Sequence, residues 1–328
     1  MKPPAPTLRK CLIRKDPDFH MSDVLSIFEF SGSESSKRIY LVGITPIVKE
    51  IFQHLGGIKR VSILLNQKYS KVKEWSSRKP ISLFDLNNLL NNCDIVFRKK
   101  IQVRIEHSEI IIKCRYSSRK VRFPKIVSPD LAYIVGLILG DGSLAGDSLN
   151  QVGNWNISIC FENHGHLKLY NALIKQIFGF GPNVYLDRGC EVSSFSSRVL
   201  HWFFKKYFEF FNGYKCNKIF VPSRILNGSN QKVVASFLQG LFDSDGTFTN
   251  NRVKYSTTSK IMAFQVQKLL ARFSISSSIS KWTKGEYKPL YTVAVSAYNS
   301  VQLFSEKVGF RHPNKRILLE NFINSPVV

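Results

Sequence analysis

One pattern occurs twice in this sequence, as Leu131-Ala-Tyr-Ile-Val-Gly-Leu-Ile-Leu-Gly-Asp-Gly142 and as Val233-Val-Ala-Ser-Phe-Leu-Gln-Gly-Leu-Phe-Asp-Ser-Asp-Gly246. Each copy is an apolar helix pattern that ends in Asp-Gly. Small residues lie four positions apart in each copy, at Gly136 and Gly140 and at Gly240 and Ser244. This spacing lets two helix backbones approach closely, so we expect the segments to pack on each other and to bring Asp141 and Asp245 together.

Two converging carboxylates predict a cation site. The C-terminus of a helix carries about half a negative charge, so a carboxylate there is unfavourable by about 0.3–1 kcal/mol, and a second carboxylate adds repulsion. Two oxygen ligands with room for water and phosphate suit Mg²⁺, which can support phosphodiester hydrolysis. Asp-Gly is also a common helix end, but that alternative explains a single copy better than two matching ones.

The paired segments resemble the LAGLIDADG signature of homing endonucleases, with Ile134 to Gly142 and Leu238 to Gly246 in its nine positions. The resemblance implies that Asp141 and Asp245 are the metal ligands. Two signatures in one chain are similar to the monomeric branch of the family, in which two halves surround an asymmetric DNA site. The implied fold class is α+β, a pseudo-two-fold pair of αββαββα halves that forms a β-saddle.

The charge of the chain predicts a nucleic-acid partner. There are 47 Lys and Arg against 23 Asp and Glu, a net charge of +24. Such an excess is typical of proteins that bind a phosphate backbone, although a generally basic proteome or an anionic membrane surface is an alternative. The six cysteines show no Cys-x-x-Cys pair. They predict reduced thiols in an intracellular protein, with an organelle as one possible location.

Similar elements are expected behind each signature helix. In the first half the pattern predicts strands over 154–161 and 183–195 and helices over 164–178 and 197–210. In the second half it predicts strands over 252–258 and 279–295 and helices over 259–273 and 298–308. This repeated order supports a duplication independently of the signatures.

The N-terminal region predicts a separate module. Residues 1–40 give no clear structure, and a helical pattern runs from 44 to 92. The segment 56–80 resembles a helix-turn-helix in which Val72 and Trp75 hold the second helix. Its DNA-facing side chains would be Lys68, Ser70, Lys71, Lys73 and Arg78. A small helical bundle with a solvated basic face is the alternative, and residues 95–125 predict a β-hairpin and a basic linker.

Further site residues follow from the resemblance. It implies a lysine near the metal-bound water in each half, which Lys218 and Lys315 match, although either could instead contact phosphate. It also places Asp243 in a structural role, and His164-Gly-His166 lacks the partners of a zinc site. Outward strand residues that could contact DNA are Asn154, Asn156, Asp187, Arg188, Glu191, Ser193, Arg252, Lys254, Ser256, Lys281, Thr283, Lys284 and Lys288.

These observations predict four segments: 1–40, a helix-turn-helix-like domain over 41–125, and two halves over 126–228 and 229–328. The expected function is a monomeric, Mg²⁺-dependent endonuclease that makes a staggered double-strand break at a long asymmetric DNA site. An RNA-binding intron maturase and a DNA-binding transcription regulator without catalysis are the alternatives. Met1 and the ending Ser325-Pro-Val-Val328 lead us to expect a free-standing protein rather than part of an intein.

Overall fold

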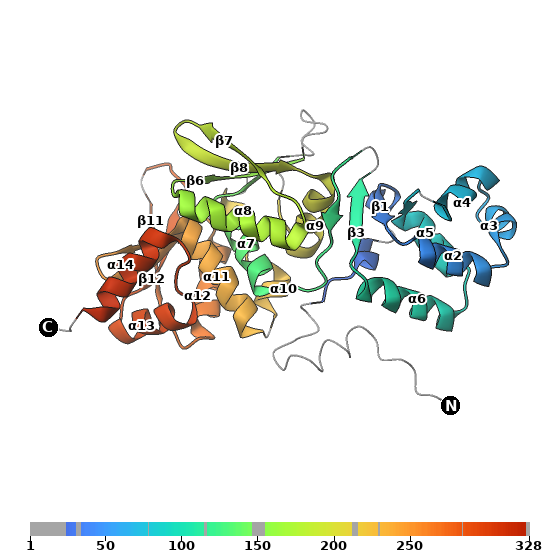
Figure 1. The fold of residues 1–328 in the computed structure, drawn as a ribbon. Helices are drawn as coiled ribbons and strands as arrows, with labels where there is room; N and C mark the ends of the chain where they lie inside the picture. Colours follow the sequence, from blue (N-terminus) through green and yellow to red (C-terminus); the bar gives the residue numbers. More distant parts are fainter. Residues whose placement is uncertain are drawn as a thin grey trace. The chain divides into compact units, whose positions relative to one another are not determined.

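The computed structural model describes residues 24–30, 34–77, 79–114, 117–145, 155–211, 216–228, 230–283 and 285–325 (Figure 1). The chain divides into two compact units. The first contains the described residues up to Ile126 together with 177–180 and 198–202, and the second contains 127–176, 181–197 and the residues from Phe203 onward. Within the described part, no helix is long and apolar enough to cross a membrane.

The first unit is built around a small antiparallel sheet. Its strand order is β2 (Ile81–Ser82), β1 (Ile39–Val42), β3 (Ile111–Cys114) and β4 (Val121–Arg122). The helices of this unit are η2 (Ile27–Phe30), η3 (Glu34–Lys37), α2 (Thr45–His54), α3 (Ile58–Leu64), α4 (Tyr69–Trp75), α5 (Leu83–Asn91) and α6 (Ile95–His107). The helical pattern predicted over 44–92 is therefore present, interrupted by β2.

The hairpin predicted over 95–125 is wrong in its first half, because Ile95–His107 is the helix α6. Asp94 explains the difference: its carboxylate accepts hydrogen bonds from the backbone N–H groups of Val96 (3.0 Å) and Phe97 (2.9 Å), which caps the helix. Ile101 and Ile105, four residues apart, are then both fully buried. Capping and burial override the strand preference of this β-branched run. The actual hairpin is formed by β3 and β4.

The signature regions form two halves with the same order of elements. The first half contains α7 (Pro129–Gly140), β5 (Ser143–Leu144), β6 (Asn156–Phe161), α8 (His164–Phe178), β7 (Asn183–Asp187), β8 (Cys190–Ser196) and α9 (Arg198–Phe208). The second contains α11 (Gln231–Asp245), β9 (Gly246–Thr249), β10 (Arg252–Thr257), α12 (Lys260–Ala271), β11 (Ser278–Trp282), β12 (Leu290–Val295), α13 (Tyr298–Lys307) and the additional α14 (Pro313–Asn324). Between the halves lie η4 (Cys216–Lys218) and α10 (Ser223–Leu226).

The sheets of the two halves have matching topology. Their strand orders are β5-β6-β8-β7 and β9-β10-β12-β11, and every pairing is antiparallel. The predicted α+β class with αββαββα halves is confirmed. The strands β5 and β9 were not predicted, because two to four residues directly after a helix are too short to show a period of two.

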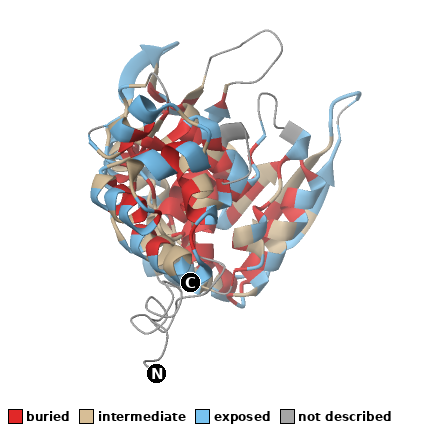
Figure 2. Cartoon of the chain, turned by 90° about the vertical axis from the view of Figure 1, so that its right-hand side faces the viewer, coloured by how far each residue is buried: buried red, intermediate tan, exposed pale blue. Residues whose placement is uncertain are grey.

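The two signature helices form the core of the second unit. Ser128 caps α7 by accepting a hydrogen bond from the Leu131 N–H, with Pro129 at the first helical position. Every residue from Leu131 to Leu139 is buried. In Figure 2 the buried positions are red and the exposed ones pale blue. A helix that is apolar and buried all round packs against other elements on every side, and α7 has its most extensive contact with α11.

A disulfide corrects the prediction of reduced thiols. Cys160 on β6 and Cys190 on β8 are joined, across a sequence separation of 30 residues. Strand pairing explains their approach, because Cys160 lies opposite Val192, two residues from Cys190 on the same face of the sheet. Their separation in sequence hid this proximity. Cys93 and Cys114 are buried free thiols, as predicted.

Candidate active site at the paired helix ends

The helices α7 and α11 touch along their backbones at the predicted small residues. A Cβ atom added at Gly136 would lie 2.8 Å from the backbone nitrogen of Leu241 and closer still to the carbonyl oxygen of Phe237. A Cβ atom added at Gly240 would lie 3.1 Å from the backbone nitrogen of Leu137. Real Cβ atoms do not approach backbone atoms this closely, so only glycine permits the contact. The predicted packing of the two signature segments is therefore present.

This packing brings the two signature carboxylates to the same place. Asp141 is the C-cap residue of α7, and Asp245 is the last residue of α11. A Cβ atom on Gly140, the residue before Asp141, would lie 3.3 Å from Oδ2 of Asp245. The buried Tyr255 senses both acids, because burial and then the charges of Asp245 and Asp141 raise its pKa well above the ordinary value. The structure thus joins the two residues that the sequence selected as metal ligands.

Lys315, from α14, reaches the same helix end. Its Nζ donates hydrogen bonds to the carbonyl oxygens of Asp243 (2.6 Å), Ser244 (3.0 Å) and Phe242 (3.2 Å). An ammonium has three hydrogens, and all three are directed at the C-terminus of α11. Burial lowers the pKa of Lys315, while the surrounding carboxylates, including both signature aspartates, act in the opposite direction. Lys315 is therefore placed to fix the helix end that carries Asp245.

Lys218 lies in a different environment. It is the exposed last residue of η4. The segment that follows it is held to α12, since Ser259 Oγ donates to the carbonyl oxygen of Ile219 (2.6 Å) and Val221 N–H donates to Gln265 (2.7 Å). The contacts of the structure bring together Lys315 and the two aspartates, whereas the role of Lys218 stays a prediction.

A buried polar network connects the two signature helices to α8 and to the start of α14. Oη of Tyr133 donates a hydrogen bond to Asp243 (2.7 Å) and contacts Nε2 of His166 (2.8 Å). The same Asp243 oxygen accepts the backbone N–H groups of Arg311 (3.0 Å) and His312 (3.1 Å). Asp243 is only 3% exposed, and burial raises its pKa to about 6. These contacts join α7, α8, α11 and the start of α14, so Asp243 has a structural role.

The two histidines of the His164-Gly-His166 segment have different roles. Burial, with smaller effects from His312 and Lys315, lowers the pKa of His166 to about 3, so this side chain is neutral. His164 is exposed and lies 2.9 Å from Glu191. Among the described residues, no cluster of three or more His, Cys, Asp or Glu side chains could hold a metal ion.

A polar pocket of about 340 Å³ opens beside Asp141. The polar groups around it include Asp141, Glu162, His166, Ser244, His312 and Lys315, together with the cysteine pair of β6 and β8. Tyr133, Glu162 and His312 were not among the site residues predicted from the sequence. The only available signal was His312-Pro313, a helix-start pattern, because the elements that bring these residues together are far apart in the chain.

The candidate DNA-contacting residues of the strands have mixed positions. Arg252, Lys254 and Ser256 alternate with the buried Val253, Tyr255 and Thr257 along β10, so they share the outward face. Ser193 is buried and donates to Asn171, which corrects its assignment as outward. Asn156 is half-buried and accepts a hydrogen bond from Ser194. Asp187, Arg188, Lys281, Thr283 and Lys288 are exposed, and Glu191 is half-buried. Asn154 and Lys284, like Arg78 of the N-terminal region, lie outside the described residues.

The geometry defines a protein with two αββαββα halves whose packed helices end in paired acids. Residues 232–309 match the family model described as a LAGLIDADG-like domain. The resemblance to this family that the doubled signature indicated is therefore confirmed over residues 232–309.

The chain is similar to parts of several larger proteins and to a solved endonuclease structure. The chain is 26% identical over 288 residues to a glutamine–fructose-6-phosphate aminotransferase of Methanocaldococcus jannaschii, covering 85% of this chain and 24% of that protein. It is 34% identical over 103 residues to a replication factor C small subunit of Thermococcus kodakarensis, covering 31% and 11%. A structure of the homing endonuclease I-DmoI matches with a TM-score of 0.46 and 18% identity, covering 56% and 96%. The chain thus spans a quarter or less of these two relatives.

Proposed function

We propose that this chain is a DNA endonuclease that hydrolyses phosphodiester bonds on both strands of a long asymmetric duplex site and leaves a staggered break. The observation that carries the proposal is the convergence of Asp141 and Asp245 at the ends of two backbone-packed helices. Repulsion between two such carboxylates opposes folding, and a protein that only bound DNA would gain nothing from it. In this proposal the halves span 126–228 and 229–328 and act within one monomer.

The residues present fit Mg²⁺, the cofactor that we propose. Mg²⁺ is usually held by one or two carboxylates, with waters and substrate phosphates completing its shell. Asp141 and Asp245 are two such carboxylates, and no third acidic, histidine or cysteine ligand joins them among the described residues. Waters and substrate phosphates would complete the rest of the shell. When bound, the metal would lower the pKa of the attacking water and stabilise the charge on the leaving oxygen.

The protein's own residues supply position and charge. The glycine contacts fix the distance between α7 and α11, and Lys315 holds the final carbonyl groups of α11. Asp243 and Tyr133 hold the start of α14 against the signature helices. Exposed Arg and Lys side chains on the strands offer contacts to phosphates and to guanine edges. This arrangement would hold a scissile phosphate at the acids while the strands lie along the duplex.

The relatives support a module that is independent of any host activity. An aminotransferase and a replication factor subunit have unrelated names, yet this chain is similar to a small part of each. A segment shared in this way is typical of a transferable module, for which cutting DNA would promote copying of its own coding element. A maturase or a regulator without catalysis would bind nucleic acid without needing both aspartates.

A cleavage screen tests the proposal. The chain is incubated with a plasmid library that carries long randomised inserts, with Mg²⁺ and separately with EDTA, and the cut ends are sequenced. We expect Mg²⁺-dependent cuts at related sites. Asp141→Asn and Asp245→Asn should abolish cutting but keep duplex binding, whereas Glu306→Gln, which changes an exposed acid of α13, should leave both intact. Cutting by both asparagine variants would contradict the site assignment, and binding without cutting by the wild type would favour the regulator or maturase.

A further inference from the structure

The first unit contains a helix-turn-helix that the candidate active site does not use. The helices α3 and α4 are joined by four residues, 65–68, and Asn66 adopts a left-handed conformation (φ 47°) in this turn. A turn of three or four residues with a left-handed position is typical of helix-turn-helix motifs. The predicted pair of short helices about a tight turn is therefore present, with α4 as the second helix.

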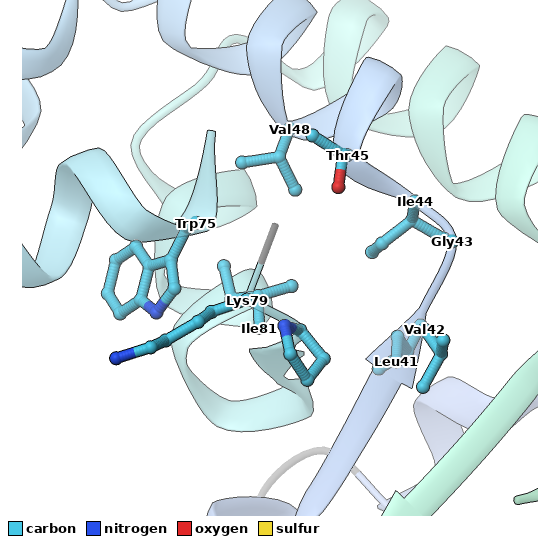
Figure 3. Close-up of a pocket in the computed structure, with 10 residues that line it drawn as sticks. Leu41, Val42, Gly43, Ile44, Thr45, Val48, Trp75, Lys79 and Ile81 are labelled. Carbon is cyan, nitrogen blue, oxygen red and sulfur yellow. The ribbon is translucent and has the colours of Figure 1, made fainter. Parts of the chain in front are cut away.

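The two sides of α4 differ sharply in burial. Val72 is fully buried, and Trp75 is only 4% exposed. Figure 3 shows Trp75 and Lys79 beside a small pocket whose other walls are residues of β1, α2 and β2. The pocket holds only about 40 Å³, little more than the volume of a water molecule, so it is a gap in the packing rather than a ligand site. Trp75 thus anchors α4, and the opposite side of the helix faces solvent.

The exposed side of α4, which we call the α4 face, is basic. It comprises Lys68, Tyr69, Ser70 and Lys73, all of them exposed. Lys71 is exposed too, but it lies on the Trp75 side of the helix, with its ammonium 5.3 Å from the centre of the Trp75 ring and 4.0 Å from Asp85. Across 56–79 there are seven Lys and Arg residues and a single acid, Glu74, whose carboxylate pairs with Lys79 at 2.6 Å. Lys59 and Arg60 on α3 are also exposed. The surrounding charge is therefore strongly positive, as expected of a surface that meets a phosphate backbone.

The size of α4 suits the major groove. Seven residues at 1.5 Å per residue make a helix of roughly 10 Å, and the major groove of B-DNA is about 12 Å wide. In a helix-turn-helix the second helix lies in that groove while the first crosses the backbone. Lys59 and Arg60 are on the first helix, and the α4 face is on the second.

We infer that the α4 face is a second DNA-binding surface, which docks into the major groove of a duplex independently of the acids of the candidate active site. Tyr69 and Ser70 would meet base edges, and Lys68 and Lys73 would meet phosphates or guanine. This inference goes beyond the proposed endonuclease, because it requires no cleavage. It adds duplex contacts to those proposed for the strands.

The test measures duplex binding by the full chain in EDTA, where cleavage plays no part. The probe is a random-sequence DNA duplex of about four helical turns, and the dissociation constant is measured at several salt concentrations. Each lost phosphate contact lowers the slope of log affinity against log salt by about 0.9. We expect the double variant Lys68→Ala with Lys73→Ala to bind more weakly and to lose about one to two from the slope.

A matched control removes the same charge elsewhere in the first unit. Lys99 on α6 and Lys120 are both exposed, and changing both to alanine should leave the slope at the wild-type value. Ser70→Glu adds a negative charge on the α4 face without altering its buried side, so it should weaken binding even if the alanine variant folds poorly. The inference would be overturned by an equal loss of slope in the control or by an unchanged slope in both α4-face variants. Equal binding of an RNA duplex would also overturn it, because the major groove of RNA is too narrow for α4.

These outcomes separate this inference from the proposed function. Normal duplex binding that does not depend on the α4 face would overturn the inference and leave the endonuclease intact. Weaker binding of the α4-face variants, together with a wild-type chain that never cuts, would support the inference and refute the endonuclease.

Discussion

Replacing Gly136 by alanine should separate the two signature helices. The new Cβ would lie 2.8 Å from the backbone nitrogen of Leu241, whereas ordinary contacts begin at 3.4 Å. The helices would have to move apart by at least 0.6 Å, the difference between these distances, and the carbonyl of Phe237 requires a larger shift. Both obstacles are backbone atoms, which cannot rotate away as a side chain could. Overpacking of this kind costs about 1–3 kcal/mol, and we expect the upper end of this range.

The assay is urea denaturation followed by circular dichroism, with Gly181→Ala as the matched control. Gly181 also belongs to the second unit, but a Cβ there would meet no atom within 4 Å, so the control should change the free energy of unfolding by less than about 1 kcal/mol. Cleavage by Gly136→Ala should fall about 100-fold, because a shift of about 1 Å misplaces the acids. Equal stability of the two variants would refute the close-packing argument.

Three further predictions follow from the site. The lowered pKa of His166, about 3 when folded, means that the unfolded chain binds more protons between about pH 3 and 6.5. Between pH 5 and pH 7 the free energy of unfolding of the wild type should therefore rise by about 2 kcal/mol more than that of His166→Gln, as measured by urea denaturation at both pH values. The same change with pH in both proteins would contradict this prediction. Asp243, with its raised pKa, acts in the opposite sense. Lys315→Met leaves three carbonyls of α11 without their donor, so the free energy of unfolding should fall by about 1–3 kcal/mol. Cleavage should also fall, while duplex affinity stays unchanged. Lys307→Met on α13 is the control, and equal effects of the two variants would argue against the capping role. Reduction of the Cys160–Cys190 disulfide should lower the free energy of unfolding by about 3–4 kcal/mol, because the bond closes a loop of 30 residues. The stability of Cys160→Ser should not change with reductant. Alkylation of both cysteines without prior reduction, detected by mass spectrometry, would contradict the disulfide.

Local sequence was sufficient where the signal repeats or lies within one helix. The bounds of α8 at His164–Phe178 agree with the prediction. The buried side of α4 also agrees, because Val72 and Trp75 are three residues apart on one face of a helix. Local sequence failed at α6, where a run of β-branched residues favoured strands and a single capping aspartate decided otherwise.

What the sequence by itself determined was the pair of helices and the acids at their ends, because small residues four positions apart and a terminal Asp-Gly are local patterns that occur twice. Only the tertiary structure decided which distant groups join them. Lys315 lies 70 residues beyond Asp245 in the chain, and Cys160 and Cys190 are 30 residues apart. Ser193 turned inward because its hydroxyl meets Asn171 on α8. Such contacts depend on strand register and helix packing, which no short stretch of sequence encodes.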